Sequence, residues 1–236
     1  ILDVDTGEHL EDVIPRTRAC SLSWLPDGSG FYYTRYPAPG EVPEGDEQYH
    51  RRIYLHRLGG DPARDEPVFG EGRDKEDWPG VHLSPDGRHL LISVSVGWTR
   101  TDLYVLHRED GRLVPLVEGE EALFDGQIHQ GHLYLHTNWE APRYRLFRVD
   151  LERPEREAWH EVLPEEEAVL EWAGVVGGSL FTSWLVDATS RFCRMELDGS
   201  GRREIPLPTL GSLGGVGGEW DGDELFFRYP HAPNSA

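Results

Sequence analysis

Short apolar runs separated by turns rich in glycine and proline recur along the whole chain. Residues 22–33 have the order strand, Pro-Asp-Gly turn, strand, and residues 81–92 repeat this order with the same three turn residues. Proline sets the φ angle that the turn needs, aspartate can accept hydrogen bonds from nearby backbone, and glycine tolerates positive φ. The two segments therefore predict two β-hairpins that belong to one repeated unit.

Weaker copies of the hairpin follow, marked by glycine at Gly131, Gly177-Gly178 and Gly222. After each of the first four hairpins comes a third strand that ends in a polar turn, at residues 53–58, 103–107, 144–149 and 192–197. A short fourth apolar strand comes next, as at residues 113–117, 158–163 and 203–207. The repeated unit is therefore predicted to be a sheet of four antiparallel strands.

Five such units in 236 residues give about 47 residues each, within the roughly 40 to 50 residues of a propeller blade. The sequence thus predicts an all-β fold, a single β-propeller domain over residues 1–236. Its four complete blades are expected near residues 15–70, 78–118, 120–164 and 168–208.

A fifth, composite blade is expected from residues 211–236 together with residues 1–14. Ile1 to Gly7 parallel Met195 to Gly199, which end a third strand and its turn, and residues near Leu10 to Ile14 could supply a fourth strand. Pairing of this N-terminal strand with the C-terminal hairpin would close a five-bladed ring. Small residues near the axis, Gly214, Gly215, Gly217 and Gly218, would permit the larger rotation between blades that five-fold closure needs.

The charge and composition of the chain limit the classes of partner that it is expected to bind. The net charge of −20 repels phosphate backbones and anionic lipid, so neither nucleic acid nor a membrane is expected as a partner. No apolar stretch is long enough to span a bilayer, and no secretory leader opens the chain, which begins inside what resembles a strand and reads as a fragment. Cys20 and Cys193 are interpreted as free thiols, which favours a cytoplasmic protein.

Catalytic motifs are missing from the sequence. The nucleophile elbow Gly-x-Ser-x-Gly does not occur, and residues 211–214 miss its spacing. Residues 214–218 carry four glycines but no following Lys-Ser/Thr, so a closely packed inner strand is favoured over a phosphate loop. The isolated chain is therefore not expected to be an enzyme.

Histidine and acidic residues are the remaining candidates for chemistry in the sequence. His129 and His132 are predicted on opposite sides of the Gly131 turn, and His132 and His136 on one face of a strand, with no further cluster to complete a metal site. The acidic run at residues 165–167 is interpreted as a loop between blades. Asp125 and Glu171 lie near inner strands, which leaves a five-bladed glycosidase open. No metal and no cofactor is expected.

Several segments, in order along the chain, resemble the β-propeller of the prolyl oligopeptidase family of serine peptidases. They are residues 1–8, 31–37 and 83–88, then Thr137-Asn138 with residues 142–146, and finally residues 169–172. The last two, Thr-Asn…Pro-x-Tyr-Arg-Leu and Val-Leu-Glu-Trp, are the most specific. The resemblance implies a seven-bladed propeller that caps an α/β-hydrolase domain, and this chain is similar to its blades three to seven.

The resemblance also implies a function. The catalytic Ser, Asp and His belong to the hydrolase domain, so none is carried over, and the chain is expected to be a scaffold and size-selective gate for oligopeptides cleaved after proline. The implied partners are that hydrolase domain and proline-containing oligopeptides. Pro79 and Trp98 fall at or beside positions where the family's propeller faces the substrate, although the family pattern has Met and Cys there; Trp98 could stack on a substrate ring. A generic protein-binding propeller with rim Trp and Arg residues and a five-bladed glycosidase or lectin stay as alternatives.

Overall fold

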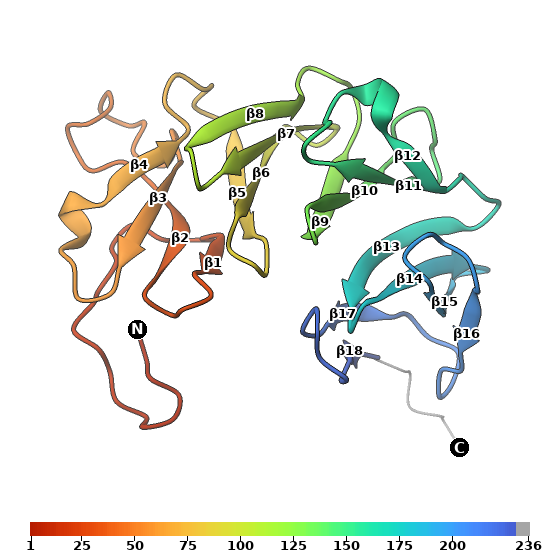
Figure 1. Ribbon diagram of the computed structural model, residues 1–236. Coiled ribbons are helices and arrows are strands. Elements are labelled where there is room, and N and C mark those ends of the chain that lie inside the picture. Colours follow the sequence, from red (N-terminus) through yellow and green to blue (C-terminus); the bar gives the residue numbers. More distant parts are fainter. Residues whose placement is uncertain (230–236) are drawn as a thin grey trace. The chain divides into compact units, whose positions relative to one another are not determined.

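The computed structural model describes residues 1–229, which fall into two compact units, residues 1–121 and the remainder from residue 122. Both units consist of antiparallel strands, and the helices of the described chain are two 3-10 turns, η1 (Pro62–Arg64) and η2 (Arg156–Ala158) (Figure 1). Within residues 1–229, no helix has the length and apolar character that crossing a bilayer requires. The predicted all-β class is confirmed.

The first unit holds two four-stranded sheets, here called blades one and two. Blade one is β1 (Leu22–Trp24), β2 (Gly30–Arg35), β3 (Arg52–Arg57) and β4 (Glu66–Phe69). Blade two is β5 (Trp78–Leu83), β6 (His89–Val96), β7 (Arg100–His107) and β8 (Arg112–Val117). In both sheets the strands lie in chain order, as in a meander, which confirms the predicted four-stranded repeat.

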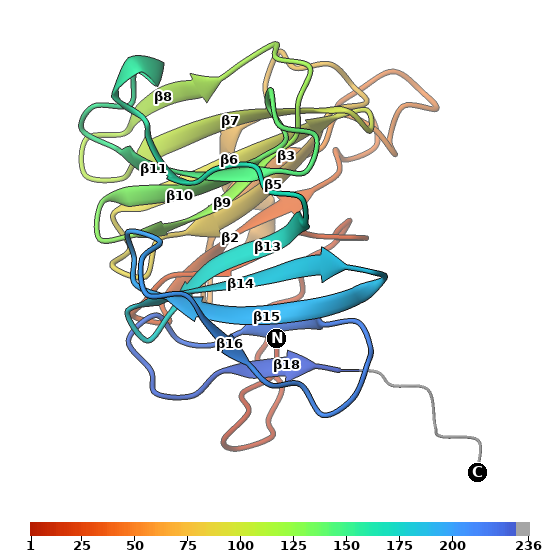
Figure 2. The ribbon, with the colours of Figure 1, turned by 90° about the vertical axis from the view of Figure 1, so that its right-hand side faces the viewer.

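The second unit holds blades three and four and a final hairpin. Blade three is β9 (Phe124–His129), β10 (His132–Thr137), β11 (Arg145–Asp150) and β12 (His160–Leu163). Blade four is β13 (Val169–Val176), β14 (Ser179–Val186), β15 (Thr189–Met195) and β16 (Arg203–Ile205). Its long strands β14 and β15 run side by side (Figure 2), and β17 (Gly214–Gly217) pairs with β18 (Phe226–Arg228) in a two-stranded sheet.

The Pro-Asp-Gly turns form as their residues predict. Asp27 accepts hydrogen bonds from the backbone N–H and the hydroxyl of Ser29, and Asp86 accepts from the N–H of Arg88. The glycine that follows each aspartate has a positive φ, 68° at Gly28 and 71° at Gly87. Each turn thus closes a hairpin at the same end of its blade.

Neighbouring blades are joined by side chains as well as by apolar packing. The hydroxyl of Ser21 accepts from the N–H of Val81, and that of Ser23 accepts from the N–H of Leu83, so two serines of blade one hold the inner strand of blade two. In the second unit the amide oxygen of Gln127 accepts from the N–H of Val175 in the same manner. We call these contacts the inter-blade seams.

The core of the first unit lies between its two blades. Ile53 of blade one packs in one cluster with Leu90, Ile92 and Val94 of blade two, and all four have no exposed surface. The second unit has an equivalent cluster around Trp184 and Leu180. Burying each such side chain stabilises the fold by about 1.5–3 kcal/mol, so the sheets are held face to face by these clusters.

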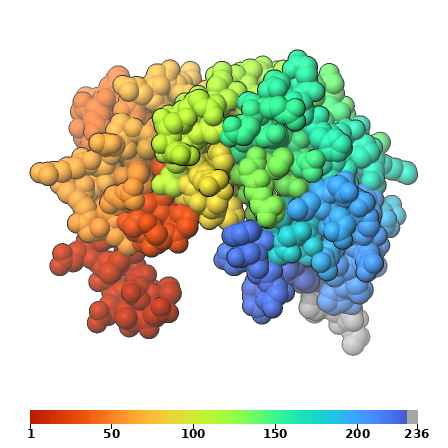
Figure 3. Space-filling view, viewed as in Figure 1, coloured from red at the N-terminus to blue at the C-terminus, as the bar shows by residue number. Residues whose placement is uncertain are grey.

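The N-terminal residues differ from their prediction. The strand expected over Ile1–Val4 is reduced to a single bridge, Leu2 with His9, and residues 10–14 are not a strand. The cause is Asp3, whose carboxylate accepts from the N–H groups of Asp5 and Thr6 and so turns the chain back at once. In Figure 3 these residues (red) project from the edge of blade one, and Ile1 and Ile14 pack on its aromatic face.

The predicted closure of a ring is not seen as a hydrogen-bonded ladder in residues 1–229. The N-terminal residues bond to one another, and β17 and β18 form a sheet of their own. The composite blade therefore stays a prediction, and its residues 230–236 lie outside the described residues. That residues 1–236 form one domain also stays a prediction.

Candidate functional site

Pro79 and Trp98 lie at the same end of blade two. Pro79 is the second residue of β5 and is buried, opposite Val94 in β6. Trp98 lies in the turn that follows β6 and is 95% exposed. The structure therefore places both residues at one sheet end, but only Trp98 presents a free surface to a ligand.

A third residue at this end, Trp78, is fixed by an arginine. The guanidinium of Arg51 lies 3.4 Å from the centroid of the Trp78 ring and 4.5 Å from that of Tyr36. Arg51 also donates to the carbonyl of Ala19 at 3.0 Å and to the hydroxyl of Tyr36, and it is only 4% exposed. Trp78 itself is 49% exposed. One face of its ring is therefore available to a ligand, and the other contacts the buried guanidinium of Arg51.

A cavity of about 550 Å³ opens beside the turn that carries Trp98. It is lined by residues that come from the segment before β5 and from the ends of β6 and β7, namely Gly72, Arg73, Asp74, Glu76, Asp77, Val96, Gly97 and Arg100. Three carboxylates and two guanidinium groups line it, so its wall is strongly polar.

Arg73 organises the floor of this cavity. Its Nε donates to Asp77 at 2.6 Å, one Nη donates to the Tyr104 hydroxyl at 2.6 Å, and the other donates to Asp102 at 2.8 Å. Asp102 also accepts from Arg100 at 3.1 Å and from the N–H of Gly119 at 3.0 Å. The carboxylates of Asp77 and Asp102 are almost fully buried, at 8% and 3% exposure.

The electrostatics of this network follow from its geometry. Burial alone would raise the pKa of Asp102, but the hydrogen bonds from Arg73, Gly119 and Arg100 lower the pKa below its ordinary value. The pKa of Tyr104 is raised by burial and by the hydrogen bond that its hydroxyl donates to Glu118. The network is therefore ionised and fixed at neutral pH, so it shapes the site but offers no group poised to exchange protons.

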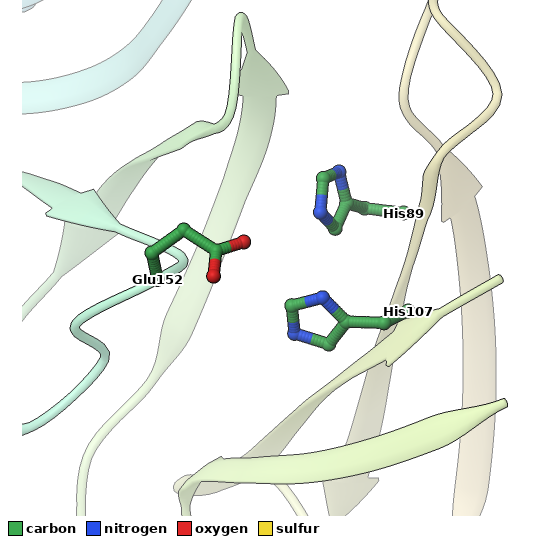
Figure 4. A group of neighbouring side chains, drawn as sticks. All are labelled: His89, His107 and Glu152. Atoms are coloured by element: carbon green, nitrogen blue, oxygen red, sulfur yellow. The ribbon is translucent and has the colours of Figure 1, made fainter. Parts of the chain in front are cut away.

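Two imidazoles of blade two lie close together. His89 begins β6, His107 ends β7, and their rings meet edge to face with centroids 5.0 Å apart (Figure 4). Glu152, which Figure 4 also labels, belongs to the second unit. Two imidazoles alone do not complete a metal site.

The other histidine group is not gathered into one ligand set. His129 and His132 pair directly across the Gly131 turn, as predicted. A ring nitrogen of His132 donates to the carbonyl of Gln130 at 3.0 Å, and one of His136 donates to the carbonyl of Leu170 at 2.7 Å. His136 also stacks on Tyr144, so its ring is engaged in packing and hydrogen bonding within the second unit.

The acidic residues singled out from the sequence have local partners. Asp125 is exposed and accepts from the N–H of Gly126, and Glu171 is exposed at a bulge of β13. Glu166 forms a two-pronged pair with Arg202 at 2.7 and 2.9 Å, and Glu165 accepts from the N–H of Arg143. The run at residues 165–167 is a loop, as predicted.

Sequence reasoning missed Arg51 and Arg73. Neither arginine belongs to a motif, and their hydrogen-bond partners lie 4 to 32 residues away along the chain. Arg51 directly precedes β3 and Arg73 lies in the segment between β4 and β5, and arginine is usually exposed in folded proteins. Nothing in the sequence distinguished them from surface residues.

Comparison with known proteins identifies the fold. Residues 1–231 match the family model for the prolyl oligopeptidase N-terminal β-propeller domain. The chain is 28% identical over 237 residues to the prolyl endopeptidase of Elizabethkingia meningoseptica, covering 97% of the chain and 33% of that protein. It is 29% identical over 178 residues to prolyl oligopeptidase A of Amanita bisporigera, covering 67% of the chain and 22% of that protein.

Solved structures agree with the family match. One from a study of two prolyl endopeptidases superposes with a TM-score of 0.90 at 31% identity, covering 97% of this chain and 34% of that one. Prolyl oligopeptidase B of Galerina marginata, bound to a 25-residue macrocyclization substrate, has a TM-score of 0.83 at 20% identity, covering 94% of this chain and 32% of that one. The chain spans about a third of the length of the prolyl endopeptidases of Elizabethkingia meningoseptica and Elizabethkingia miricola. It belongs to the family of prolyl oligopeptidase N-terminal β-propeller domains.

Proposed function

We propose that this chain is the propeller part of a cytoplasmic serine peptidase that cleaves oligopeptides after proline. In that enzyme it is a scaffold and a size-selective gate for an α/β-hydrolase domain that carries the catalytic residues. The observation that carries the proposal is the family match over residues 1–231 together with 31% identity to a prolyl endopeptidase structure. The reported relatives are all named as prolyl peptidases, which gives no support to a glycosidase or lectin.

Trp98 is the residue we assign to the substrate side. It is 95% exposed on the turn beside the polar cavity, and Trp78 and Pro79 lie at the same end of the blade. A free indole ring can stack on a proline or aromatic ring of a peptide. Pro79 is buried and is proposed to shape the wall beneath this surface.

The first test is hydrolysis by the chain alone. The purified 236-residue chain is expected to leave a Gly-Pro chromogenic reporter intact, because the sequence contains no nucleophile elbow. Turnover that a serine-directed inhibitor blocks would contradict the proposal.

The second test is a chimera. This chain replaces the matching third of the E. meningoseptica prolyl endopeptidase, and cleavage of a short proline peptide is compared with cleavage of a folded protein that exposes a proline loop. The chimera is expected to cleave the peptide and spare the protein; loss of this discrimination with the peptide activity intact would refute the gate.

In the same chimera, Trp98→Ala is expected to raise KM for the peptide about two- to tenfold, since an aromatic contact contributes about 0.5–1.5 kcal/mol. Leu210→Ala is the matched control, because Leu210 is also an exposed apolar residue, at 83%, outside the proposed surface. Equal kinetics for the two variants would remove Trp98 from the site.

A further inference from the structure

The N-terminal strap, residues 1–14, contacts one face of blade one through Ile1, Asp12 and Ile14, while most of its other residues are exposed. That face carries Phe31, Tyr33 and Tyr54, which are 2%, 0% and 5% exposed. Ile1 and Ile14 of the strap pack against these three rings. Cys20 and Leu58, which flank strands of blade one, pack against the same cluster, so the strap supplies part of its cover.

The strap is attached by a buried charged group. The Nε2 atom of His56 lies 2.9 Å from a carboxylate oxygen of Asp12 in the strap, and its Nδ1 atom lies 3.0 Å from the carboxylate of Asp65, which follows η1. His56 has no exposed surface, and the Asp12 and Asp65 side chains are 5% and 7% exposed. We call Asp12, His56 and Asp65 the clamp.

The hydrogen bonds in the clamp determine how many protons the ring of His56 carries. An ionised carboxylate only accepts hydrogen bonds, and a neutral imidazole has a single N–H donor. Both ring nitrogens of His56 face a carboxylate, so a neutral ring would set a nitrogen lone pair against an oxygen lone pair on one side. The arrangement is satisfied when His56 is an imidazolium that donates on both sides.

The remaining groups around the clamp reinforce this arrangement. The Tyr33 hydroxyl donates to Asp65 at 2.8 Å, and the N–H of Gly59 donates to Asp12 at 2.7 Å. Further cations near these rings are Arg35, whose guanidinium lies 4.0 Å from the Tyr54 centroid and 5.9 Å from that of Tyr33, and the ammonium group of Ile1, which donates to the carbonyl of Asp12 at 3.2 Å. The ring of Phe31 packs 5.3 Å from the imidazole, which keeps water away from it.

We propose that the protonation state of the clamp controls whether the strap stays on blade one. The strap is bound while His56 carries two ring protons and Asp12 and Asp65 are ionised, and it detaches when either condition fails. The two-sided geometry of His56, its complete burial and the strap's place over an aromatic face carry this inference. It does not depend on the peptidase assignment.

The sign of the pH dependence follows from the proton count. The hydrogen bond from His56 is the main cause that lowers the pKa of Asp12, while burial opposes it. A carboxyl with a lowered pKa contributes attachment that is present above its unfolded value and is lost only as pH falls through the lowered value. A ring nitrogen of His56 without its proton would leave one carboxylate of the clamp without a donor. The strap is therefore held only while both ring nitrogens carry protons and both carboxylates are ionised.

The test is NMR of the full chain with ¹⁵N-labelled histidine and backbone. At neutral pH, His56 is expected to show the ¹⁵N shifts of an imidazolium with both nitrogens protonated, and the Gly59 amide to be shifted downfield by its bond to Asp12. As pH rises, the two signals are expected to change together, and amide protection of residues 8–14 to fall about tenfold, in line with the loss of one charge-assisted hydrogen bond.

Two variants separate the clamp from general folding. Asp12→Asn removes the strap's charge and is expected to abolish the coupled transition, with amides of β6 unchanged as the measure of intact folding. Asp3→Asn is the matched control, because Asp3 lies in the same strap but accepts only from Asp5 and Thr6. A neutral His56 at pH 7, or the same pH profile in wild type and Asp12→Asn, would overturn the proposal.

Discussion

Replacing Arg73 by methionine tests how far a buried ionic network stabilises the first unit. Methionine keeps the apolar stem of the side chain and removes the guanidinium, which is 19% exposed and donates to Asp77, Asp102 and Tyr104. The free energy of unfolding is expected to fall because Asp77 and Asp102 remain in place with fewer partners.

The size of the loss can be worked from the contacts. Hydrogen bonds to charged groups contribute about 1.5–3 kcal/mol each, but the three bonds share one network and do not add. Asp102 keeps Arg100 and the N–H of Gly119, so it is not stranded. Breaking a buried pair costs roughly 3–5 kcal/mol, and we expect about 3–4 kcal/mol, or a melting temperature about 10 °C lower for a chain of this size.

The assay is thermal and urea unfolding followed by circular dichroism, at pH 7 and in acid. Because Arg73 helps to lower the pKa of Asp102, the stabilisation it provides is present above the ordinary aspartate range and is lost as pH falls through the lowered value. The difference between wild type and Arg73→Met should therefore shrink in acid.

Arg112→Met is the matched control for this prediction. It is the same substitution in the same blade, but Arg112 and its partner Asp110 are 50% and 59% exposed and 3.6 Å apart, and exposed pairs contribute little. Its melting temperature should stay at the wild-type value. Equal losses for the two variants, or a loss for Arg73→Met that does not change with pH, would refute the assignment of the stability to the buried network.

Three further predictions concern the stability or titration of single residues. Trp184→Ala removes a ring that is 2% exposed and should cost about 3–5 kcal/mol, while Trp98→Ala should leave urea unfolding unchanged. Gly30→Ala should destabilise blade one in thermal unfolding, because its Cβ would lie 2.2 Å from the carbonyl oxygen of His56; Gly217→Ala, with nothing within 4 Å, should not. Burial lowers the pKa of His136 from 6.5, so NMR should find it titrating below that value, and stability should fall as pH drops from 6.5 toward the lowered pKa because the unfolded chain takes up the proton first.

Local patterns were enough to predict the sheets. The turn residues at Asp27 and Asp86 make the backbone hydrogen bonds that their types suggest, and the apolar runs between turns became strands because each buries a face against the next blade. The error at Ile1–Val4 has the same local origin: the run is apolar enough for a strand, but the Asp3 carboxylate turns the backbone after it.

The chemistry of the candidate site and the clamp depends on contacts that no local pattern contains. His56 meets Asp12 from 44 residues away, and Arg73 meets Asp102 from 29 residues away. Arginine and aspartate are residue types usually found at the surface, and histidine is intermediate, so their burial here follows from tertiary packing and not from residue type. Pro79 and Trp98 were placed through the family resemblance, and their role stays a proposal.

The inter-blade seams predict where the structure would first separate under mechanical force. Within a blade, every strand is tied to its neighbour by a ladder of backbone hydrogen bonds. Between blades one and two, the inner strands are held by the hydroxyls of Ser21 and Ser23 and by apolar contact, with no shared ladder. A force pulling these two blades apart would therefore meet less resistance at the seam than inside either sheet, and each blade would detach as an intact piece before any of its strands unravelled.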